Sequence, residues 1–460
     1  MSSNIHLHIA CYSTSYNATI LDSLPFVRFF YERSLWMTLL LKQTYDRVII
    51  LADSPVADSV IDYHLVNLLG LQGEELKSAK SRLKVIVPKI ADNTLLPIEE
   101  SVLADPSSID LIKAEISLAN NASFHAFTSS DSLDLLAATL GLKCDQPPVS
   151  LAEQWGSKSG SRQLLSEANV PIPRGTLLPV SSLDLIQTEV SNLLRQFPNT
   201  KKLLLKLNSS AWGDGLGQVL IDLDLFRKTE ALRPSMVAFG QEWPVIEREL
   251  LRDGAIIEEF IPNILSCPSG QGVVDLQGKV TVISAHDQVM DGTSYVGCCW
   301  PVGEEIAHFV HDSVKQVGEC LAQRGVWGHF GVDFILTDDG KMMGTEINLR
   351  KVGPSHVQRY VNLIVESRNS IEQSLKDNST YAYINKRYFK PDQLRLATTK
   401  FLLREMQFEQ IEYNRETNQG ILLHLLTAYD ECGYLEMTAI ARNIQEAKFI
   451  LQKAEILAFQ

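Results

Sequence analysis

The sequence predicts a mixed α/β (α+β) protein that is built from more than one domain. At 460 residues the chain is too long for a single compact core, so two or three domains are expected. Its hydrophobic share of 45% and charged share of 21% are ordinary for a globular protein. Strand and helix patterns alternate near the start of the chain, and a hairpin with polar side chains follows much later.

The first part of the chain is expected to fold as a Rossmann-like domain. Short apolar runs that read as strands alternate with helical patterns such as Val56–Leu69, and this order favours a parallel sheet with right-handed crossovers. We find no glycine-rich phosphate loop here, so a structural role is favoured over a second nucleotide site. Two prolines within 145–148 predict a domain boundary. The apolar runs are Ile5–Ala10, Arg47–Ala52 and Leu83–Val87.

Charge and composition argue against several classes of partner. A net charge of −13 disfavours a nucleic-acid binder, which needs Lys and Arg to neutralise phosphates. The most apolar early run, Leu24–Leu41, is interrupted by charged residues and is not expected to cross a membrane. No signal peptide is recognised, and the seven cysteines form no C-x-x-C pair. We therefore expect a cytoplasmic protein with reduced thiols, without nucleic-acid or membrane partners.

The segment Gly328–His356 predicts two strands joined by a turn. Apolar residues alternate with Asp333 in the first strand, and Asp339-Gly340 suits a two-residue type I′ loop. With that loop Asp333 lies opposite Glu346, whereas a four-residue loop would place it opposite Gly344. Because side chains alternate with period two, Asp333 and Glu346 share one face in both cases. Asn348 and Arg350 follow on that face while the chain stays extended.

This face has the side chains of a magnesium site. Two carboxylates that face each other across a hairpin repel, and a divalent cation would offset the repulsion. Mg²⁺ takes one or two carboxylates together with substrate phosphates, and Mn²⁺ is the alternative ion. Asn348 adds a neutral oxygen, and Arg350 adds a fork of donors for a phosphate or carboxylate. The alternative is a solvated face with a surface salt bridge from Glu346 to Arg350. The predicted metal ligands are Asp333, Glu346 and Asn348.

A lysine strand and a glycine-rich segment precede the hairpin. Lys206 lies in the apolar strand 201–208, where an ammonium group is costly to desolvate unless an anion is near. The segment 209–217 follows, and its glycines would let backbone N–H groups approach phosphate oxygens. No Gly-Lys-Ser/Thr follows, so this is not a Walker P-loop. The candidate phosphate-binding residues in this segment are Ser209, Ser210, Gly213, Gly215 and Gly217.

Other polar positions are weaker candidates. A strand that contains Ile256 and Ile257 ends in two glutamates, which suits an adenine pocket, although an ordinary strand end would look the same. His286, Asp287 and Gln288 follow the second strand of a hairpin over 272–283, where they could face the acceptor substrate or lie in a loop. His356 could bind substrate or act as a base, but a lone histidine is more often structural.

The hairpin also carries a family resemblance. The motif E-I-N-L-R at 346–350, after D-F-I-L at 333–336, resembles the ATP-grasp ligases and their E-x-N-x-R subgroup. The extension 351–356, K-V-G-P-S-H, resembles peptide ligases of the pheganomycin type. This resemblance implies a pre-ATP-grasp domain at 1–146, an ATP-grasp catalytic domain at 147–376 and a small α+β cap or lid at 377–460.

The resemblance also implies roles for individual residues. Lys158, early in a helix, would reach the ATP phosphates, and Lys206 would act with Arg350 in catalysis. Glu258 would accept the exocyclic amine of adenine, and the next three residues would form the hinge beside the ring. Where many ATP-grasp enzymes have a glutamate for the ribose, this chain has 263–269, with Ser266 or Ser269 as substitutes. The implied hinge residues are Glu259, Phe260 and Ile261.

The function implied is that of an ADP-forming carboxylate–amine ligase. A substrate carboxylate would attack the γ-phosphate of ATP to give an acyl phosphate, which an amine then converts to an amide. Arg350 would hold the carboxylate or the later oxyanion. Amino acids or peptides are the expected substrates, and a homodimer is the expected assembly. The alternatives are a ligase for another carboxylate or nucleophile, and a nucleotide-binding protein without catalysis.

Overall fold

The computed structural model describes residues 4–13, 24–89, 96–209, 217–229, 231–238, 242–292, 294–365, 381–390 and 398–459. The chain folds into two compact units that each contain helices and strands, which confirms the predicted α/β class. The predicted division into three domains stays a prediction. The first unit contains Met1–Val149, Gly297–Glu304 and Arg350–Gln460, and the second contains Ser150–Val296 and Glu305–Leu349.

The N-terminal part of the first unit is a four-stranded parallel sheet with the order β3-β2-β1-β4. The predicted parallel sheet is thereby confirmed. One strand, β4, was not predicted, because serine and histidine alternate with its apolar residues. The strands are β1 (His6–Cys11), β2 (Asp46–Leu51), β3 (Leu83–Ile86) and β4 (Asn121–Ala126).

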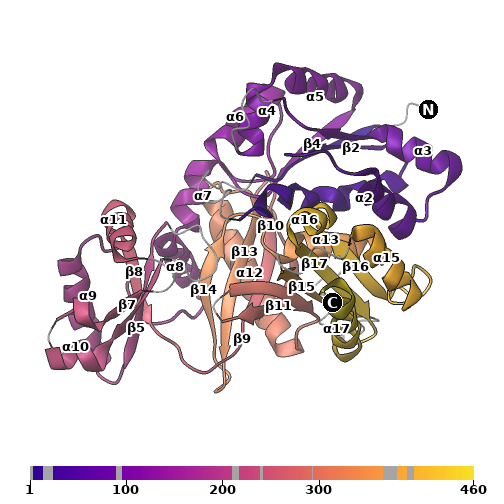
Figure 1. Cartoon of the computed structure of the whole chain (residues 1–460). Helices are drawn as coiled ribbons and strands as arrows, with labels where there is room; N and C mark the ends of the chain where they lie inside the picture. Colours follow the sequence, from indigo (N-terminus) through magenta and orange to yellow (C-terminus); the bar gives the residue numbers. More distant parts are fainter. Residues whose placement is uncertain are drawn as a thin grey trace. The chain divides into compact units, whose positions relative to one another are not determined.

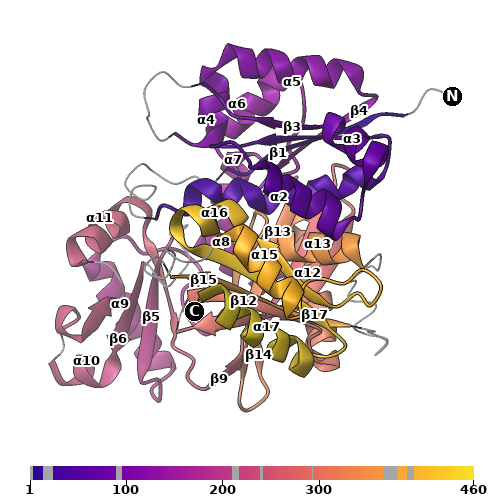
Figure 2. The same ribbon diagram turned by 45° about the vertical axis from the view of Figure 1, so that its right-hand side comes forward.

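Helices cover both faces of this sheet. Ile9, Ile49 and Phe124 point into a core that they share with α4, α5 and α6, which Figure 2 shows together on one side of the strands. On the other face η1 packs against β1 and β2. The helices in this part are η1 (Val27–Lys42), α2 (Asp58–Asp62), η2 (Tyr63–Leu68), α3 (Gly73–Arg82), α4 (Ile98–Ala104), α5 (Pro106–Leu118) and α6 (Asp131–Leu140).

The C-terminal part of the first unit is antiparallel. β15 pairs with β17 on one side and with the end of β12 on the other, and β16 pairs with β17. Every residue of β17 is buried, and α17 packs against that strand. The elements are β12 (Ser294–Trp300), α13 (Pro354–Ile364), β15 (Ala382–Phe389), α15 (Thr399–Phe408), β16 (Gly420–His424), α16 (Leu426–Cys432), β17 (Tyr434–Ala441) and α17 (Ile444–Phe459).

The second unit begins with two helices and a small antiparallel sheet. The sheet has the order β7-β6-β5-β8, and α9, α10 and α11 share a hydrophobic core with it (Figure 1). The elements are α7 (Val149–Gly156), α8 (Lys158–Glu167), α9 (Leu183–Gln196), β5 (Lys202–Leu207), β6 (Gln218–Asp222), α10 (Leu223–Thr229), η3 (Arg233–Ser235), β7 (Met236–Ala238), α11 (Trp243–Asp253) and β8 (Ala255–Glu259).

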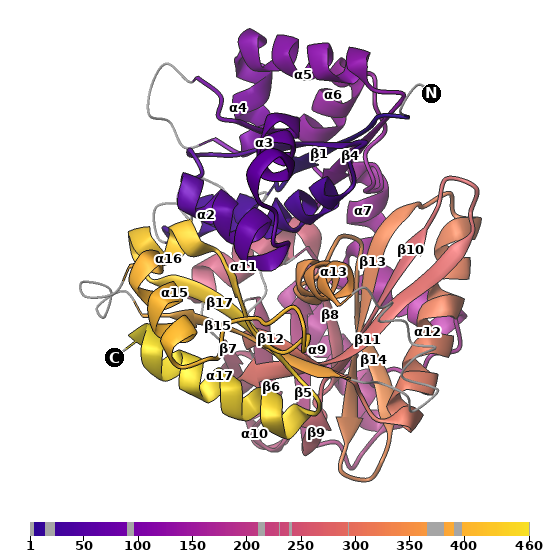
Figure 3. The same ribbon diagram turned by 90° about the vertical axis from the view of Figure 1, so that its right-hand side faces the viewer.

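A larger group of antiparallel strands completes the second unit. β14, β13, β10 and β11 lie side by side in that order, with α12 along them (Figure 3). At Gly270 a Cβ would come within 2.5 Å of Val310 and Val314 of α12, so glycine permits the close approach of helix and strand. The elements are β9 (Ile264–Ser266), β10 (Pro268–Val274), β11 (Val280–Asp291), α12 (Glu304–Gln323), β13 (Gly328–Thr337) and β14 (Met342–Asn348).

No helix in the described part of the chain is long and apolar enough to cross a lipid bilayer. The predicted cytoplasmic location and homodimer stay predictions.

Candidate active site

The predicted hairpin is formed by β13 and β14. Asp333 lies opposite Glu346, as one of the two predicted registers requires. The turn differs from the prediction, because the Thr337 N–H donates to the Lys341 carbonyl and leaves a three-residue loop. Gly340 has a positive φ of 80° but Asp339 does not, which excludes a type I′ turn. An irregularity in the pairing after Asp333 then restores the register of the two carboxylates.

The polar side chains of this hairpin converge. The Asn348 amide donates to Asp333 Oδ2 at 2.8 Å, and the Gln288 amide donates to Asp333 Oδ1 at 2.9 Å. The Lys158 ammonium forms an ion pair with Glu346 Oε1. The structure therefore brings together the three predicted metal ligands and Lys158. It also brings Gln288 to Asp333, a contact that was not predicted.

The donor set at this hairpin fits a hard divalent cation. Among the described residues, no three His, Cys, Asp or Glu side chains are grouped so that they could hold a metal ion by themselves. The hairpin instead offers two half-buried carboxylates and one carboxamide, and all three groups supply oxygen atoms as ligands. Such a set leaves coordination positions for water and phosphate oxygens, as Mg²⁺ prefers.

The start of α8 is tied to the end of β5. Ser157 caps the helix by accepting from the Gly160 N–H at 3.0 Å. The N–H of Lys158 donates to the carbonyl of Asn208 at 3.0 Å, and the N–H of Ser159 donates to the side chain of Asn208 at 2.9 Å. The backbone that carries Lys158 is thus fixed to the strand that carries Lys206.

Lys206 lies in a buried charged cluster. Its ammonium is 2.5 Å from Glu258 Oε1, and the Arg162 guanidinium donates to Glu258 Oε2 at 2.8 Å. Arg162 also donates to the carbonyls of Pro173 and Thr176. The three charged residues are only 9%, 3% and 2% exposed, so these contacts replace water that each charge has lost. The anion that the sequence analysis required for Lys206 is therefore Glu258.

Arg162 was not predicted as a site residue. Burial lowers its pKa, and the neighbouring Glu258 acts in the opposite direction. The signal in the sequence is an arginine on the face of α8 that also presents Leu165 to the interior. Its partners lie far away in the chain, so spacing alone did not reveal them.

The predicted hinge begins at Glu259, the last residue of β8. The Glu259 carboxylate pairs with Arg174 at 2.7 Å, and its N–H donates to the Arg174 carbonyl. The N–H of Phe260 donates to the carbonyl of Lys202, and the Phe260 ring is 37% exposed. Ile261 is half-buried beside it.

The glycine-rich segment is described only at its two ends. A hydrogen bond from Ser209 helps to lower the pKa of Asp253, after the larger effect of Arg252. Gly217 has a φ of 72°, and its carbonyl accepts from the Leu207 N–H. Ser210, Gly213 and Gly215 lie outside the described residues.

His286 lies within β11 and not after it, because β11 extends as far as Asp291. Its ring is fully buried, and Nδ1 is 3.2 Å from the Ser284 hydroxyl. Burial lowers the pKa of His286 to about 3. The loop alternative is therefore wrong, and in this conformation the ring does not reach an open substrate site.

We expect acid to destabilise the protein through His286. Its pKa is lower in the folded state, so the stability that the neutral ring contributes is present above pH 6.5 and is lost as the pH falls toward 3. From pH 7.5 to 5 this loss is about 2 kcal/mol. Urea unfolding at both pH values should show a smaller acid-induced loss for His286→Leu than for the wild type. An equal acid-induced loss of stability in both proteins would contradict a lowered pKa of His286 in the folded state.

Arg350 and His356 belong to the first unit. β14 ends at Asn348, so Arg350 lies beyond the extended stretch on which its shared face depended. Its Nη1 donates to the Lys351 carbonyl at 3.0 Å, and its Cζ lies 5.4 Å from the centre of the Phe127 ring. His356 is buried in α13, with Nε2 3.0 Å from Glu436 Oε1.

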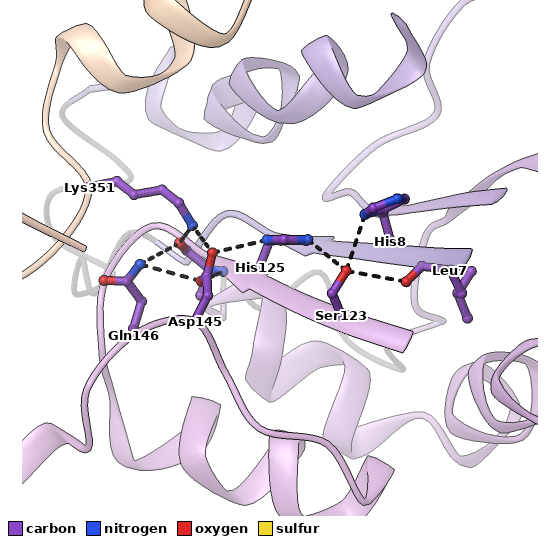
Figure 4. A network of polar contacts seen from close by, with 8 residues as sticks. Leu7, His8, Ser123, His125, Asp145, Gln146 and Lys351 are labelled. Carbon is purple, nitrogen blue, oxygen red and sulfur yellow. Dashed lines mark hydrogen bonds and ion pairs between the residues drawn. The ribbon is translucent and has the colours of Figure 1, made fainter. Parts of the chain in front are cut away.

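Lys351 anchors the segment that carries Arg350. Its ammonium is 2.6 Å from Asp145 Oδ2 and 2.5 Å from the Ala126 carbonyl (Figure 4). Asp145 also contacts His125 at 3.0 Å, and His125 contacts Ser123 at 2.8 Å. The segment after β14 is thus bound to the carboxyl end of β4.

Known proteins resemble this chain in sequence and in fold. Residues 228–352 match the family model described as "IQCH-like, ATP-grasp", and residues 402–453 match the "PGM1 C-terminal domain". Solved structures of ATP-grasp enzymes share the fold. The ADP complex of the purK N5-carboxyaminoimidazole ribonucleotide synthetase has a TM-score of 0.54 at 10% identity and covers 99% of this chain and 97% of its own. A biotin carboxylase from Campylobacter jejuni has a TM-score of 0.57 at 13% identity, with coverages of 98% and 90%.

The fold and the site together define an ATP-grasp enzyme. Among curated proteins, L-propargylglycine–L-glutamate ligase from Streptantibioticus cattleyicolor is 30% identical to this chain over 451 residues, which are 98% of this chain and 93% of the relative. The chain belongs to the ATP-grasp family of ligases. It is an ADP-forming ligase that joins a carboxylate to an amine, which confirms the predicted class.

Proposed function

We propose that this ligase joins the carboxylate of one amino acid or peptide to the amine of another. The register of β13 and β14 carries the proposal, because it places Asp333 opposite Glu346 with Asn348 and Lys158 in contact. The sequence similarity to a ligase named for two amino acids supports this substrate class. The amide product would be released with ADP and phosphate.

Different residues of the second unit would bind the metal ion, the phosphates and the adenine of ATP. Asp333, Glu346 and Asn348 would hold Mg²⁺, which supplies positive charge to the phosphates when bound. Lys158 and Lys206 would neutralise charge that develops on the phosphoryl group, so catalysis rests on positioning and electrostatics. Glu258 and the segment 259–261 would recognise adenine. The segment 209–217 would cover the phosphates.

Arg350 and the first unit would handle the organic substrates. The guanidinium of Arg350 donates to the carbonyl of its neighbour Lys351, and its fork suits a carboxylate or an oxyanion. We propose that 1–146 and 377–460, the pre-ATP-grasp and cap regions, contribute to this substrate site. Neither His286 nor His356 is needed in this scheme as a nucleophile.

Hydroxylamine trapping tests the proposed function. The protein is incubated with ATP, Mg²⁺ and hydroxylamine, and the carboxylate is varied over amino acids and peptides, beginning with L-glutamate and L-propargylglycine. We expect a hydroxamate and one equivalent of ADP, since hydroxylamine intercepts an acyl phosphate.

Three other outcomes would count against the proposal. AMP and pyrophosphate would exclude an acyl phosphate. Turnover only with carboxylates that lack an amino group would favour a different substrate class. Nucleotide binding without turnover across the whole panel would favour a non-catalytic protein.

A further inference from the structure

A polar cluster lies at the carboxyl end of the parallel sheet in the first unit. From β1 the chain builds the sheet toward β2 and β3, and it then returns to place β4 on the other side of β1. Crevices at such points of reversal are where open α/β sheets bind ligands. Ser13 follows β1, Asp53 follows β2 and Ser130 follows β4, while Glu99 comes from the first turn of α4.

Glu99 has one carboxylate oxygen with partners and one without. The hydroxyls of Ser13 and Ser130 both donate to Oε1, at 2.5 and 2.9 Å. Oε2 is buried, and it has no hydrogen-bond partner among the described residues. The residue is only 1% exposed, so its carboxylate is shielded from bulk solvent. A buried carboxylate oxygen without a donor costs desolvation free energy, and it indicates that a ligand supplies the donor.

A second carboxylate, that of Asp53, stands at the same edge of the sheet, because Asp53 and Ser13 each lie two residues beyond the paired residues Leu51 and Cys11. Desolvation and the charge of Glu99 raise the pKa of Asp53 to about 7, although the Asp53 side chain still reaches solvent, and Arg28 acts in the opposite direction. Burial also raises the pKa of Glu99, with a further contribution from Glu100. The hydroxyls of Ser13 and Ser130 both donate to Oε1, so neither of them is the partner of Oε2.

We infer that Glu99 and Asp53 form a binding site for the ammonium group of an amino-acid substrate. This inference rests on the proposed function, because it names the part of the substrate that the first unit recognises. An ammonium group has three donors and no acceptor, so it complements an orphan oxygen beside a second carboxylate. Asp53 reaches solvent and gives the site its entrance, whereas Glu99 is its buried end.

A purely structural role for Glu99 makes a different prediction. A buried glutamic acid that stays protonated has nearly the shape and hydrogen-bonding capacity of glutamine. Glu99→Gln should then change neither binding nor stability. If Glu99 binds an ammonium group, the same change removes the charge and leaves the folded structure intact.

The test compares amino acids with analogues that lack only the amino group. Calorimetric titration of the full-length protein uses L-glutamate against glutarate and L-propargylglycine against pent-4-ynoate. We expect the wild type to bind at least one amino acid ten-fold more tightly than its analogue, and Glu99→Gln to lose that preference. Whichever pair shows the effect identifies the substrate whose ammonium is recognised.

Kinetics and a matched variant complete the test. Glu100→Gln is the control, because Glu100 is the adjacent acid and accepts from Ser132 at 3.0 Å. In Glu99→Gln we expect the KM of one amino acid to rise at least ten-fold, with the KM of ATP unchanged. Asp53→Asn, at a position that reaches solvent, should show the same split if Glu99→Gln does not fold.

Several results would overturn the site. These are wild-type behaviour in Glu99→Gln, equal binding of an amino acid and its analogue, and no binding of either amino acid to the wild type. Failure of the proposed function looks different, since no pair of substrates would then release ADP. In that case an amino-dependent binding preference that Glu99→Gln abolishes would still establish the ammonium site.

Discussion

Glu346→Gln is expected to reduce ADP release by about 10³-fold while the fold stays intact. The change removes one of the two facing carboxylates and leaves Lys158 without its ion-pair partner. The Glu346 side chain is 29% exposed, so the neutral amide can remain in place with its polar end hydrated. The measurement is the initial rate of ADP release at saturating ATP and substrates, together with the circular dichroism spectrum.

Asp338→Asn is the matched control for Glu346→Gln. Asp338 is an exposed acid in the loop of the same hairpin, away from the paired carboxylates. Its variant should retain the wild-type rate. A normal rate in Glu346→Gln would remove Glu346 from the metal ligands, and equal losses in both variants would indicate general damage to the hairpin.

Arg162→Met should cause the largest loss of stability, about 3–5 kcal/mol. The variant removes the buried guanidinium of Arg162. One carboxylate oxygen of Glu258 and two backbone carbonyls then lose their hydrogen-bond donor. Lys206 still pairs with Glu258 in this variant, so the Glu258 carboxylate keeps one cationic partner and the protein is expected to remain folded. Urea unfolding, followed by circular dichroism, measures the change.

Arg174→Met is the comparison for this prediction. Arg174 also pairs with a glutamate at the end of β8, but its side chain is 53% exposed. Exposed ion pairs contribute at most about 1 kcal/mol, so this variant should unfold close to the wild type. Similar losses in the two variants would show that burial of the Arg162–Glu258 pair has little effect.

Local rules predicted the hairpin of β13 and β14 from the sequence. Alternation with period two placed Asp333 and Glu346 on one face for both loop lengths considered, two and four residues. The turn itself was wrong, because the choice between two and three loop residues depends on the φ angle of Asp339, which an Asp-Gly pair does not determine. The irregularity after Asp333 compensates for the extra residue.

Contacts between residues that are far apart in the chain could not be predicted from the sequence. Arg162 meets Glu258 across 96 positions, and Gln288 meets Asp333 across 45. Neither pair has a local spacing that would reveal it. β4 was missed for a related reason, because Ser123 and His125 take part in the network with Asp145, and their polar character hides the strand.

The attachment of α8 to β5 through Asn208 affects the conformational entropy that the backbone at Lys158 and Lys206 can still lose when a nucleotide binds. The backbones that carry Lys158 and Lys206 are held together by hydrogen bonds on both the carbonyl and the side chain of a single asparagine. Ordering of these two cationic positions therefore accompanies folding and does not have to accompany ATP capture. With the roles proposed for Lys158 and Lys206, less of the free energy of nucleotide binding would be spent on ordering the backbone that carries them.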